Sequence, residues 1–389
     1  MISVSMPTYA RIDLAFERGE GAYLYGEDGK KYLDFGSGIA VTAFGHANDH
    51  ITETIQKQAA ALCHVSNLYR IPEQERLAER LVLSTFADTV FFGNSGGEAL
   101  ECGIKLIRKF HYHLGMPERH RIITFGGAFH GRTIAAISAG NQAKHIEGFA
   151  PLLEGFDQVP FGDVDAVRAA VGPETAGILV EPIQGETGIN VAPEGFLQSL
   201  REIADERGIL LFFDEVQCGM GRTGRLFAHE WDDVIPDVMA SAKALGAGFP
   251  ISACLSTERA AAGMIAGTHG STFGGNPLAC SVANSVLDLM LAPGFLQQVE
   301  SRGTLLRERL ETLVVENSAV FESVRGRGLM LGLKCVLPNT EVIDVARGEG
   351  LLVVIAADNV VRLLPPLNVE EGQIDEAIAV LCRVCSQVS

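Results

Sequence analysis

Short apolar runs alternate with amphipathic stretches through the centre of the chain. The runs lie at 89–93, 121–125, 176–182, 208–215 and 237–243. Continuous apolar runs of this length are typical of buried parallel strands. Helical patterns separate most of the runs, so the alternation predicts a mostly parallel α/β sheet.

The two ends of the chain have a different pattern. GAYLYG and KKYLDF flank a turn at 27–29 and predict a hairpin. The other expected elements are helices near 50–62, 72–83, 278–291, 297–316 and 374–385, and strands at 329–335, 351–355 and 360–364. We therefore expect a large domain at 50–275 and a smaller α+β domain built from both chain ends, 1–49 and 276–389.

Composition and charge narrow the class of protein. The 389 residues are 47% hydrophobic, and the net charge of −17 argues against nucleic-acid or anionic-membrane partners. No run approaches the roughly 20 apolar residues of a membrane span, and the N-terminus lacks signal-peptide order. Cys382 and Cys385 form a lone CxxC without further metal ligands. We expect a soluble cytoplasmic protein without a metal site.

Two chemically active residues end neighbouring runs. Asp214 closes GILLFFD and Lys243 closes DVMASAK, with the spacing of one strand–helix–strand unit of about 30 residues. Both side chains are expected at the carboxyl edge of one sheet, where open α/β folds bind ligands. A lysine amine condenses with an aldehyde, and a carboxylate keeps a pyridine nitrogen protonated. The pair suits pyridoxal 5'-phosphate, although an ordinary strand-end acid and a solvated lysine fit the spacing too.

Polar segments follow several other strands. NSGGEALE opens a helix, where Ser95, Gly96 and Gly97 bring backbone N–H groups to an anion, unless they simply cap the helix. In FHGRT, Phe129 could stack on a flat ring and Arg132 bind a carboxylate, or both could be structural. Weaker signals come from Glu181, Gln184, Glu186, Ser271, Thr272 and Arg362.

One motif favours a different class of protein. GMGRTG at 219–224 matches the dinucleotide-binding pattern GxGxxG. The segment after it is a poor helix start, and the strand before it ends in Asp214 and Glu215, which are unfavourable neighbours for a pyrophosphate. A loop is therefore the preferred interpretation, and a nucleotide-dependent dehydrogenase would rest on this motif alone.

Together, NSGGEALE, FHGRT, EPIQGETG, DEVQCGMGRTG, AKALGAGFP, HGSTFGGNP and RLLPPL resemble the class III aminotransferases. The resemblance covers nearly the whole chain. It implies the fold-type-I α/β architecture of pyridoxal phosphate enzymes, with a large mostly parallel sheet sandwiched by helices and a smaller α+β domain. GIAV, HVSNLY, FHGRT and HGSTFGGNP are most similar to the acetylornithine branch. That branch implies transfer of an amino group from N-acetylornithine to 2-oxoglutarate, in arginine biosynthesis, by a homodimer.

The resemblance also assigns roles. Lys243 would hold the cofactor aldehyde and Asp214 its ring nitrogen, with Phe129 and Val216 on the ring faces and Gln217 near the ring hydroxyl. The cofactor-binding residues implied are Ser95, Gly96, Gly97, Phe129, Asp214, Glu215, Val216, Gln217, Lys243 and Thr272 of the partner subunit.

Substrate recognition is assigned to a second group. Arg132 would bind the α-carboxylate of acetylornithine, with Ser271 nearby. Arg362 would bind the α-carboxylate of 2-oxoglutarate, and Glu186 would pair with Arg362 when the distal amine reacts. Ornithine aminotransferases carry Tyr where this chain has Ile39, which favours an acylated amine. Departures from the commoner family pattern occur at Gly97, Cys218 and Ala244.

Several alternatives stay open at this stage. Related aminotransferases act on succinyldiaminopimelate, succinylornithine or 4-aminobutyrate, and the sequence separates these substrates poorly. An aminomutase of the same fold would have no use for the 2-oxoglutarate site at Arg362. A non-catalytic binding protein would lack Lys243 or Asp214, and both are present.

Overall fold

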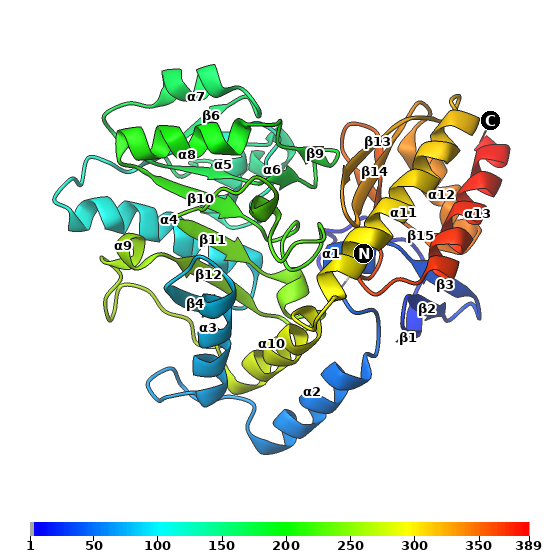
Figure 1. Cartoon of the computed structure of the whole chain (residues 1–389), viewed down its shortest axis with the longest axis horizontal. Helices are drawn as coiled ribbons and strands as arrows, with labels where there is room; N and C mark the ends of the chain where they lie inside the picture. Colours follow the sequence, from blue (N-terminus) through cyan, green and yellow to red (C-terminus); the bar gives the residue numbers. More distant parts are fainter. Residues whose placement is uncertain (1–3, 389) are drawn as a thin grey trace.

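A seven-stranded sheet lies at the centre of the computed structural model, which describes residues 4–388 (Figure 1). Its strand order is β4-β12-β11-β10-β7-β5-β6. The strands are β4 (Thr89–Gly93), β5 (Arg121–Phe125), β6 (Phe156–Val159), β7 (Thr175–Val180), β10 (Leu210–Asp214), β11 (Val238–Ser241) and β12 (Ser252–Ser256). All neighbours are parallel except β12, which is antiparallel to both β11 and β4. The predicted mostly parallel sheet is confirmed.

Helices cover both faces of this sheet. Phe212 and Phe213 are consecutive and completely buried, so their side chains leave β10 on opposite faces. Phe212 packs under α4 (Gly96–His113), where a Cβ on Gly103 would meet its ring. Phe213 lies in the core that includes α8 (Phe196–Arg207). This double cover explains why the central strands read as continuous apolar runs.

The connection from β10 to β11 differs from the predicted strand–helix–strand unit. It contains only the 3-10 helix η1 (Ala228–Trp231). GMGRTG lies in this connection and forms a loop, with left-handed φ angles at Met220, Gly221 and Gly224. A dinucleotide motif requires a helix directly after its glycines. The preference for a loop is therefore confirmed.

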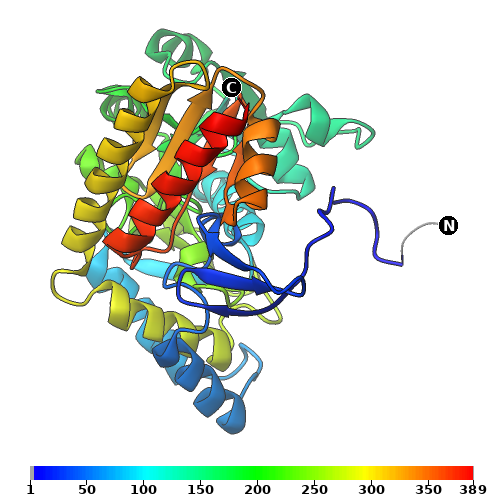
Figure 2. The same ribbon diagram turned by 90° about the vertical axis from the view of Figure 1, so that its right-hand side faces the viewer.

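The remaining strands form smaller sheets, one of which joins the two chain ends (Figure 2). β3 (Lys31–Asp34) pairs in parallel with β15 (Leu351–Leu352), so the N-terminal hairpin and the C-terminal part share one sheet. A second sheet, β13-β14-β17-β16, is covered by α11, α12 and α13. Its elements are α11 (Phe295–Glu316), β13 (Phe321–Arg327), β14 (Met330–Cys335), α12 (Asn339–Gly348), β16 (Val354–Ala356), β17 (Val360–Leu363) and α13 (Glu371–Val388).

The other elements connect these sheets or flank them. They are β1 (Phe16–Glu20), β2 (Tyr23–Gly26), α1 (Ser37–Ala40), α2 (Asp49–Ala61), α3 (Pro72–Ser84), α5 (Ile134–Gly140), α6 (Ala143–Ile146), α7 (Val164–Ala170), β8 (Ile183–Gln184), β9 (Asn190–Val191), η2 (Lys243–Leu245), α9 (Glu258–Ala261) and α10 (Pro277–Met290). Helix α10 packs on α2 and α3, the helices expected in the large domain. The predicted domain boundaries stay a prediction.

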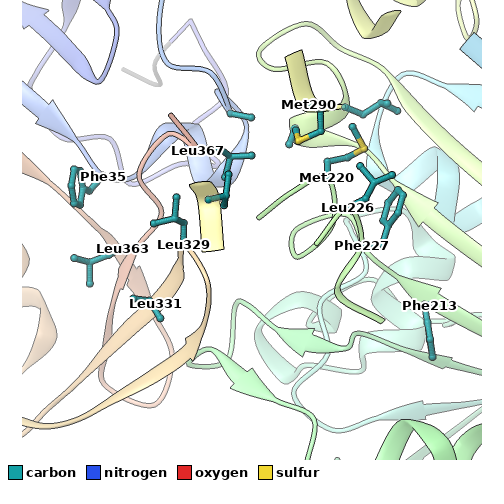
Figure 3. Packing of buried hydrophobic residues seen from close by; sticks show 14 of the residues in the cluster. Phe35, Phe213, Met220, Leu226, Phe227, Met290, Leu329, Leu331, Leu363 and Leu367 are labelled. Carbon is teal, nitrogen blue, oxygen red and sulfur yellow. The ribbon is translucent and has the colours of Figure 1, made fainter. Parts of the chain in front are cut away.

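The two parts of the molecule share a continuous apolar core (Figure 3). Leu329 and Leu367 from the smaller part approach Met220 and Met290 from the larger part. Beside them, the buried Arg222 guanidinium donates through Nη1 to the carbonyl oxygens of Leu329, at 3.1 Å, and Pro365, at 2.5 Å. These contacts fix the smaller sheet against the carboxyl edge of the larger one.

A membrane span was not expected from the sequence. Among residues 4–388, no single helix is both long and apolar enough to cross a bilayer. Only α10 and α11 taken together reach that length and composition, and they are bent by 71° relative to each other.

Candidate active site

A cavity of about 330 Å³ lies at the carboxyl ends of the central strands. Its walls come from the loops after β4, β5, β7, β10 and β11, so one edge of the sheet supplies most of them. The lining residues are Val41, Asn94, Ser95, Gly96, Gly97, Phe129, His130, Gly131, Glu181, Asp214, Val216, Gln217, Ala242, Lys243, Gly248, Phe249, Pro250 and Ile251. Eight of the residues predicted to bind the cofactor are among them.

Asp214 and Lys243 meet in this cavity because β10 and β11 are parallel neighbours, with Asp214 paired to Ala240. Asp214 Oδ1 accepts the Val216 N–H at 3.0 Å, and Oδ2 lies 2.7 Å from His130 Nδ1. Burial lowers the pKa of Lys243 to about 8. An amine that loses its proton this readily is prepared for attack on an aldehyde.

The N-terminus of α4 forms one end of the cavity. Ser95 caps the helix, and its hydroxyl accepts the Glu98 N–H at 3.4 Å. Gly96 and Gly97 open the first turn, where free N–H groups and the helix dipole attract an anion. The space in front of these N–H groups is called the α4 cradle. A Cβ on Gly96 would come within 2.8 Å of a Val216 methyl, so a side chain at this position would fill the α4 cradle.

A partly buried ion pair contacts Gln217, one of the residues that line the cavity. Arg362 from β17 is 1% exposed and donates through Nη1 to Glu186 Oε1 and to Gln217 Oε1, both at 2.8 Å. Burial raises the pKa of Glu186, but the Arg362 charge and hydrogen bond lower it by more, so the net pKa is below its ordinary value. The structure therefore brings Glu186, Gln217 and Arg362 together.

None of the five predicted substrate residues is among the residues that line the cavity, and neither is Thr272, which was predicted to bind the cofactor. Arg132 is exposed, with its guanidinium carbon 5.4 Å from the centre of the Phe129 ring. Ser271 accepts hydrogen bonds from the Gly274 N–H at 2.9 Å and from Asn94 Nδ2 at 3.4 Å, so it lies beside the α4 cradle. Thr272 is exposed. Ile39 is 38% exposed and has a φ of 65°, which is strained for a β-branched residue.

Like Thr272, Glu215 does not line the cavity, whereas the other eight predicted cofactor residues do. Its carboxylate accepts the backbone N–H groups of Ala228 and His229 at 2.7 and 2.8 Å and lies 2.9 Å from His229 Nδ1. These contacts cap η1 and leave no oxygen for a cofactor. Cys218, one of the departures from the family pattern, is buried beside it with Sγ 3.4 Å from Glu215 Oε2. Ala244, another departure, is buried in η2.

Two ionisable residues of the cavity were not among the predicted site residues. His130 follows Phe129 directly and holds Asp214, but a single histidine within FHGRT carries no chemical signature of its own. Glu181 ends β7, where acidic residues are common, and was considered only a weak signal. The one clue to both residues was their position, since each follows a strand that ends at the same edge of the sheet as Asp214.

Comparison with known proteins identifies the family of this chain. The family model for class-III aminotransferases matches residues 4–385, so the chain belongs to this family. Pyridoxal phosphate is the cofactor of the family, and the fold is that of the fold-type-I enzymes. The chain is an aminotransferase.

Individual relatives refine this result. The chain is 58% identical to acetylornithine aminotransferase from Brucella melitensis, covering 95% of this chain and 92% of that protein. It is also 58% identical to acetylornithine aminotransferase from Rhodobacter capsulatus, covering 97% and 96%. Among solved structures, N-acetylornithine aminotransferase from Stenotrophomonas maltophilia is similar with a TM-score of 0.86 at 36% identity, covering 98% and 97%. Ornithine aminotransferase from Toxoplasma gondii reaches 0.95 at 30% identity, covering 99% and 93%.

The residues present fit pyridoxal phosphate. The Gly96–Val216 approach leaves space for the phosphate rather than for a side chain. Asp214 and the half-buried Lys243 supply an acid and an amine at the ends of neighbouring strands. Phe129 and Val216 are two apolar walls for a flat ring. The donor set of the cavity therefore matches each functional part of this cofactor.

Proposed function

We propose that this chain transfers the δ-amino group of N-acetylornithine to 2-oxoglutarate, giving N-acetylglutamate 5-semialdehyde and glutamate, in arginine biosynthesis. The observation that carries this proposal is the Glu186–Arg362 pair beside Lys243. A carboxylate that masks Arg362 disfavours substrates with a carboxylate next to the reacting carbon. The names of the relatives at 58% identity support the same substrate.

The chemistry divides between cofactor and protein. When bound, pyridoxal phosphate supplies an aldehyde that takes the amino group and a ring that accepts electrons. Asp214 holds the proton on the ring nitrogen, and His130 orients that carboxylate through the 2.7 Å contact. The α4 N–H groups bind the phosphate. Lys243, whose pKa of about 8 is close to neutral pH, would accept and release at Nζ the proton that leaves the substrate carbon.

Substrate orientation falls to the two arginines. Arg132 is free of an ion pair within residues 4–388 and exposed above Phe129, so it is suited to bind the α-carboxylate of acetylornithine. For 2-oxoglutarate, Arg132 would take the γ-carboxylate, and Arg362 would leave Glu186 to take the α-carboxylate. The apolar Ile39 would leave no polar partner for a free α-amine.

Assembly and location complete the proposal. We infer a homodimer in which Thr272 of the partner subunit completes the phosphate site. This assembly is supported by exposed apolar residues next to the cavity loops, including Phe273 at 62% and Ile134 at 49% exposure. A cytoplasmic location is supported by the free thiols of Cys63, Cys102, Cys218, Cys254, Cys280, Cys335 and Cys382.

The substrate is tested by the visible absorption of the holoenzyme. N-acetylornithine, added without a keto acid, should bleach the cofactor band, while ornithine and 4-aminobutyrate should bleach it far more slowly. Equal or faster bleaching by succinylornithine, succinyldiaminopimelate or 4-aminobutyrate would contradict the proposed substrate and leave the family intact. The dimer is tested by sedimentation, where a monomer at the enzyme's working concentration would contradict it.

A further inference from the structure

The short helix α1, which directly precedes a cavity residue, is a left-handed turn. Its four residues, Ser37, Gly38, Ile39 and Ala40, have φ angles of 47°, 61°, 65° and 62°. A left-handed conformation costs free energy at every residue except glycine, so three of the four positions are strained. Strain of this kind persists only where the surrounding structure holds the turn in place.

Asp34 supplies contacts that hold this turn. It ends β3 and is 4% exposed, and its Oδ1 accepts the N–H groups of Gly36 and Ser37, both at 2.9 Å. Its Oδ2 lies 2.8 Å from Nε2 of His46. Both oxygens of this buried side chain are therefore engaged, and together they fix the point at which the chain enters α1.

His46 is itself fixed against the first hairpin. Its backbone N–H donates to the Gly21 carbonyl oxygen at 2.8 Å, and its own carbonyl oxygen accepts the Gly21 N–H at 3.0 Å. A Cβ on Gly19 would come within 2.5 Å of His46 Cβ, so the hairpin packs directly on this side chain. The contact between Asp34 and His46 therefore closes a loop that contains α1.

This loop contacts both the cavity and the strands of the smaller sheet. Val41 follows α1 directly and lines the cavity. On the other side, a Cβ on Gly36 would meet a Val354 methyl at 2.9 Å, and Val354 is paired with Arg362 between β16 and β17. A displacement of α1 would therefore reach a wall of the cavity and the strand pair that carries Arg362.

We propose that Asp34, fixed by His46, is a positioning residue for the amino donor, because it holds α1 in its left-handed conformation and so keeps Val41 where the donor contacts it. This inference rests on the proposed function, in which the donor is N-acetylornithine. Neither Asp34 nor His46 is among the residues that line the cavity, so neither touches the reacting atoms. Loss of the Asp34 contacts should weaken donor binding and leave the chemical step and the cofactor site in place.

Steady-state kinetics of the holoenzyme with N-acetylornithine tests this role. Asp34→Ala releases the turn, so KM for the donor should rise about tenfold while kcat stays within about threefold. Asp34→Asn keeps an oxygen for both N–H groups and offers an amide to His46, so KM should stay within about twofold of wild type. Asp28→Ala is the matched control. Asp28 also accepts a backbone N–H, from Lys30 at 3.0 Å, and a side-chain donor, the Tyr32 hydroxyl at 2.6 Å, but it does not line the cavity or contact α1, and its loss should change neither value.

Two further variants test the turn itself. Ala40→Gly relieves strain at a φ of 62°, so it should leave KM nearly unchanged in wild type and recover about threefold of the loss in the Asp34→Ala background. His46→Ala removes one of the three Asp34 contacts and should raise KM about threefold. This milder variant gives a result even where Asp34→Ala fails to fold. No recovery by Ala40→Gly would show that Asp34 does not act through the left-handed turn.

Hydrogen exchange of the cofactor-free proteins adds a measurement that does not depend on turnover. The Val41 N–H bonds to the Ser37 carbonyl oxygen at 2.7 Å and not to Asp34, so its exchange reports opening of the turn. It should exchange about tenfold faster in Asp34→Ala and at the wild-type rate in Asp28→Ala. Equal rates in Asp34→Ala and wild type would overturn the proposal.

The kinetic outcomes separate this inference from the proposed function. An unchanged KM in both Asp34→Ala and His46→Ala would overturn the inference. So would a rise in KM matched by an equal loss of affinity for pyridoxal phosphate, because that result indicates a general loss of structure. No reaction of wild type with N-acetylornithine would instead overturn the proposed function, and hydrogen exchange would then decide whether Asp34 holds the turn.

Discussion

The two ends of the cavity are built in different ways. The cofactor end uses Asp214, Lys243 and the Gly96–Gly97 turn, which lie at strand ends of one sheet and need only strand pairing to meet. The substrate end uses Glu186 from the larger part, Arg362 from the smaller sheet and the exposed Arg132. Chemistry common to the family therefore rests on a rigid sheet edge. Under the proposed function, substrate choice would depend on contacts between parts of the molecule, which can change without disturbing that edge.

The largest expected effect is at the cofactor end. Lys243→Ala should lower kcat about 10⁴-fold or more, because no other amine from residues 4–388 lines the cavity to move the proton. The variant should still bind pyridoxal phosphate through α4, Asp214 and the ring walls, as measured by equilibrium dialysis. Lys30→Ala, which changes an exposed lysine in the first hairpin, should keep full activity. Substantial turnover by Lys243→Ala would show that another residue is the catalytic base.

The second prediction uses the stability of the cofactor-free protein. Burial lowers the pKa of Lys243 from 10.5 to about 8. Below pH 8 the amine is charged in both folded and unfolded states, and the cost of burying it is present in full. Between about 8 and 10.5 only the unfolded state keeps the proton, so the contribution of Lys243 to stability rises with pH.

Comparison with Lys243→Met isolates this contribution. The variant should be more stable than wild type by about 3 kcal/mol below pH 8, and the gap should close as the pH approaches 10.5. Urea unfolding of both cofactor-free proteins at several pH values measures the gap. Taking the difference removes other groups that titrate in this range, including the tyrosines. A gap that does not change with pH would mean that Lys243 is not buried as an amine at this site.

The same contrast between the two ends explains what could be predicted from the sequence. β4 and β5 have the predicted boundaries, because their apolar runs are local signals. β12 was missed because Ser252–Ser256 is rich in small and polar residues, although all of it is buried. The predicted strand at 351–355 divides into β15 and β16, which pair with different sheets.

The same difference between local and long-range signals applies to the residues of the site. The Asp214–Lys243 pair could be predicted because spacing along the chain and parallel pairing place both residues at one edge. The Glu186–Arg362 pair came only from family resemblance, since 176 residues separate its partners and no local pattern links them. His130 and Glu181 could not be singled out, because their contacts with Asp214 and with the Phe129 N–H exist only in the folded chain.

The third prediction concerns the substrate end. Glu186→Ala removes the carboxylate that masks Arg362, so catalytic efficiency with glutamate relative to acetylornithine should rise about tenfold, the value of one partly exposed charge-assisted hydrogen bond. Glu206→Ala is a matched control, since Glu206 pairs with Arg168 on the surface at 3.1 Å. Steady-state kinetics with both amino donors gives the ratio. An unchanged ratio would show that Glu186 does not block Arg362, and it would contradict the physical basis proposed for substrate choice.

The smallest effect separates two adjacent glycines at the cofactor end. Gly96→Ala places a methyl 2.8 Å from Val216 Cγ1, so either the helix start or the Val216 wall must move. Affinity for pyridoxal phosphate should fall about tenfold, as expected for a mildly overpacked site. Gly97→Ala meets a Thr133 methyl at 3.6 Å and Ser95 Oγ at 3.9 Å, both ordinary contacts, and should leave affinity unchanged. Fluorescence titration of both cofactor-free variants measures the difference. Equal losses in the two variants would mean that α4 tolerates no side chain at its start and that the departure at Gly97 is itself a requirement of this phosphate site.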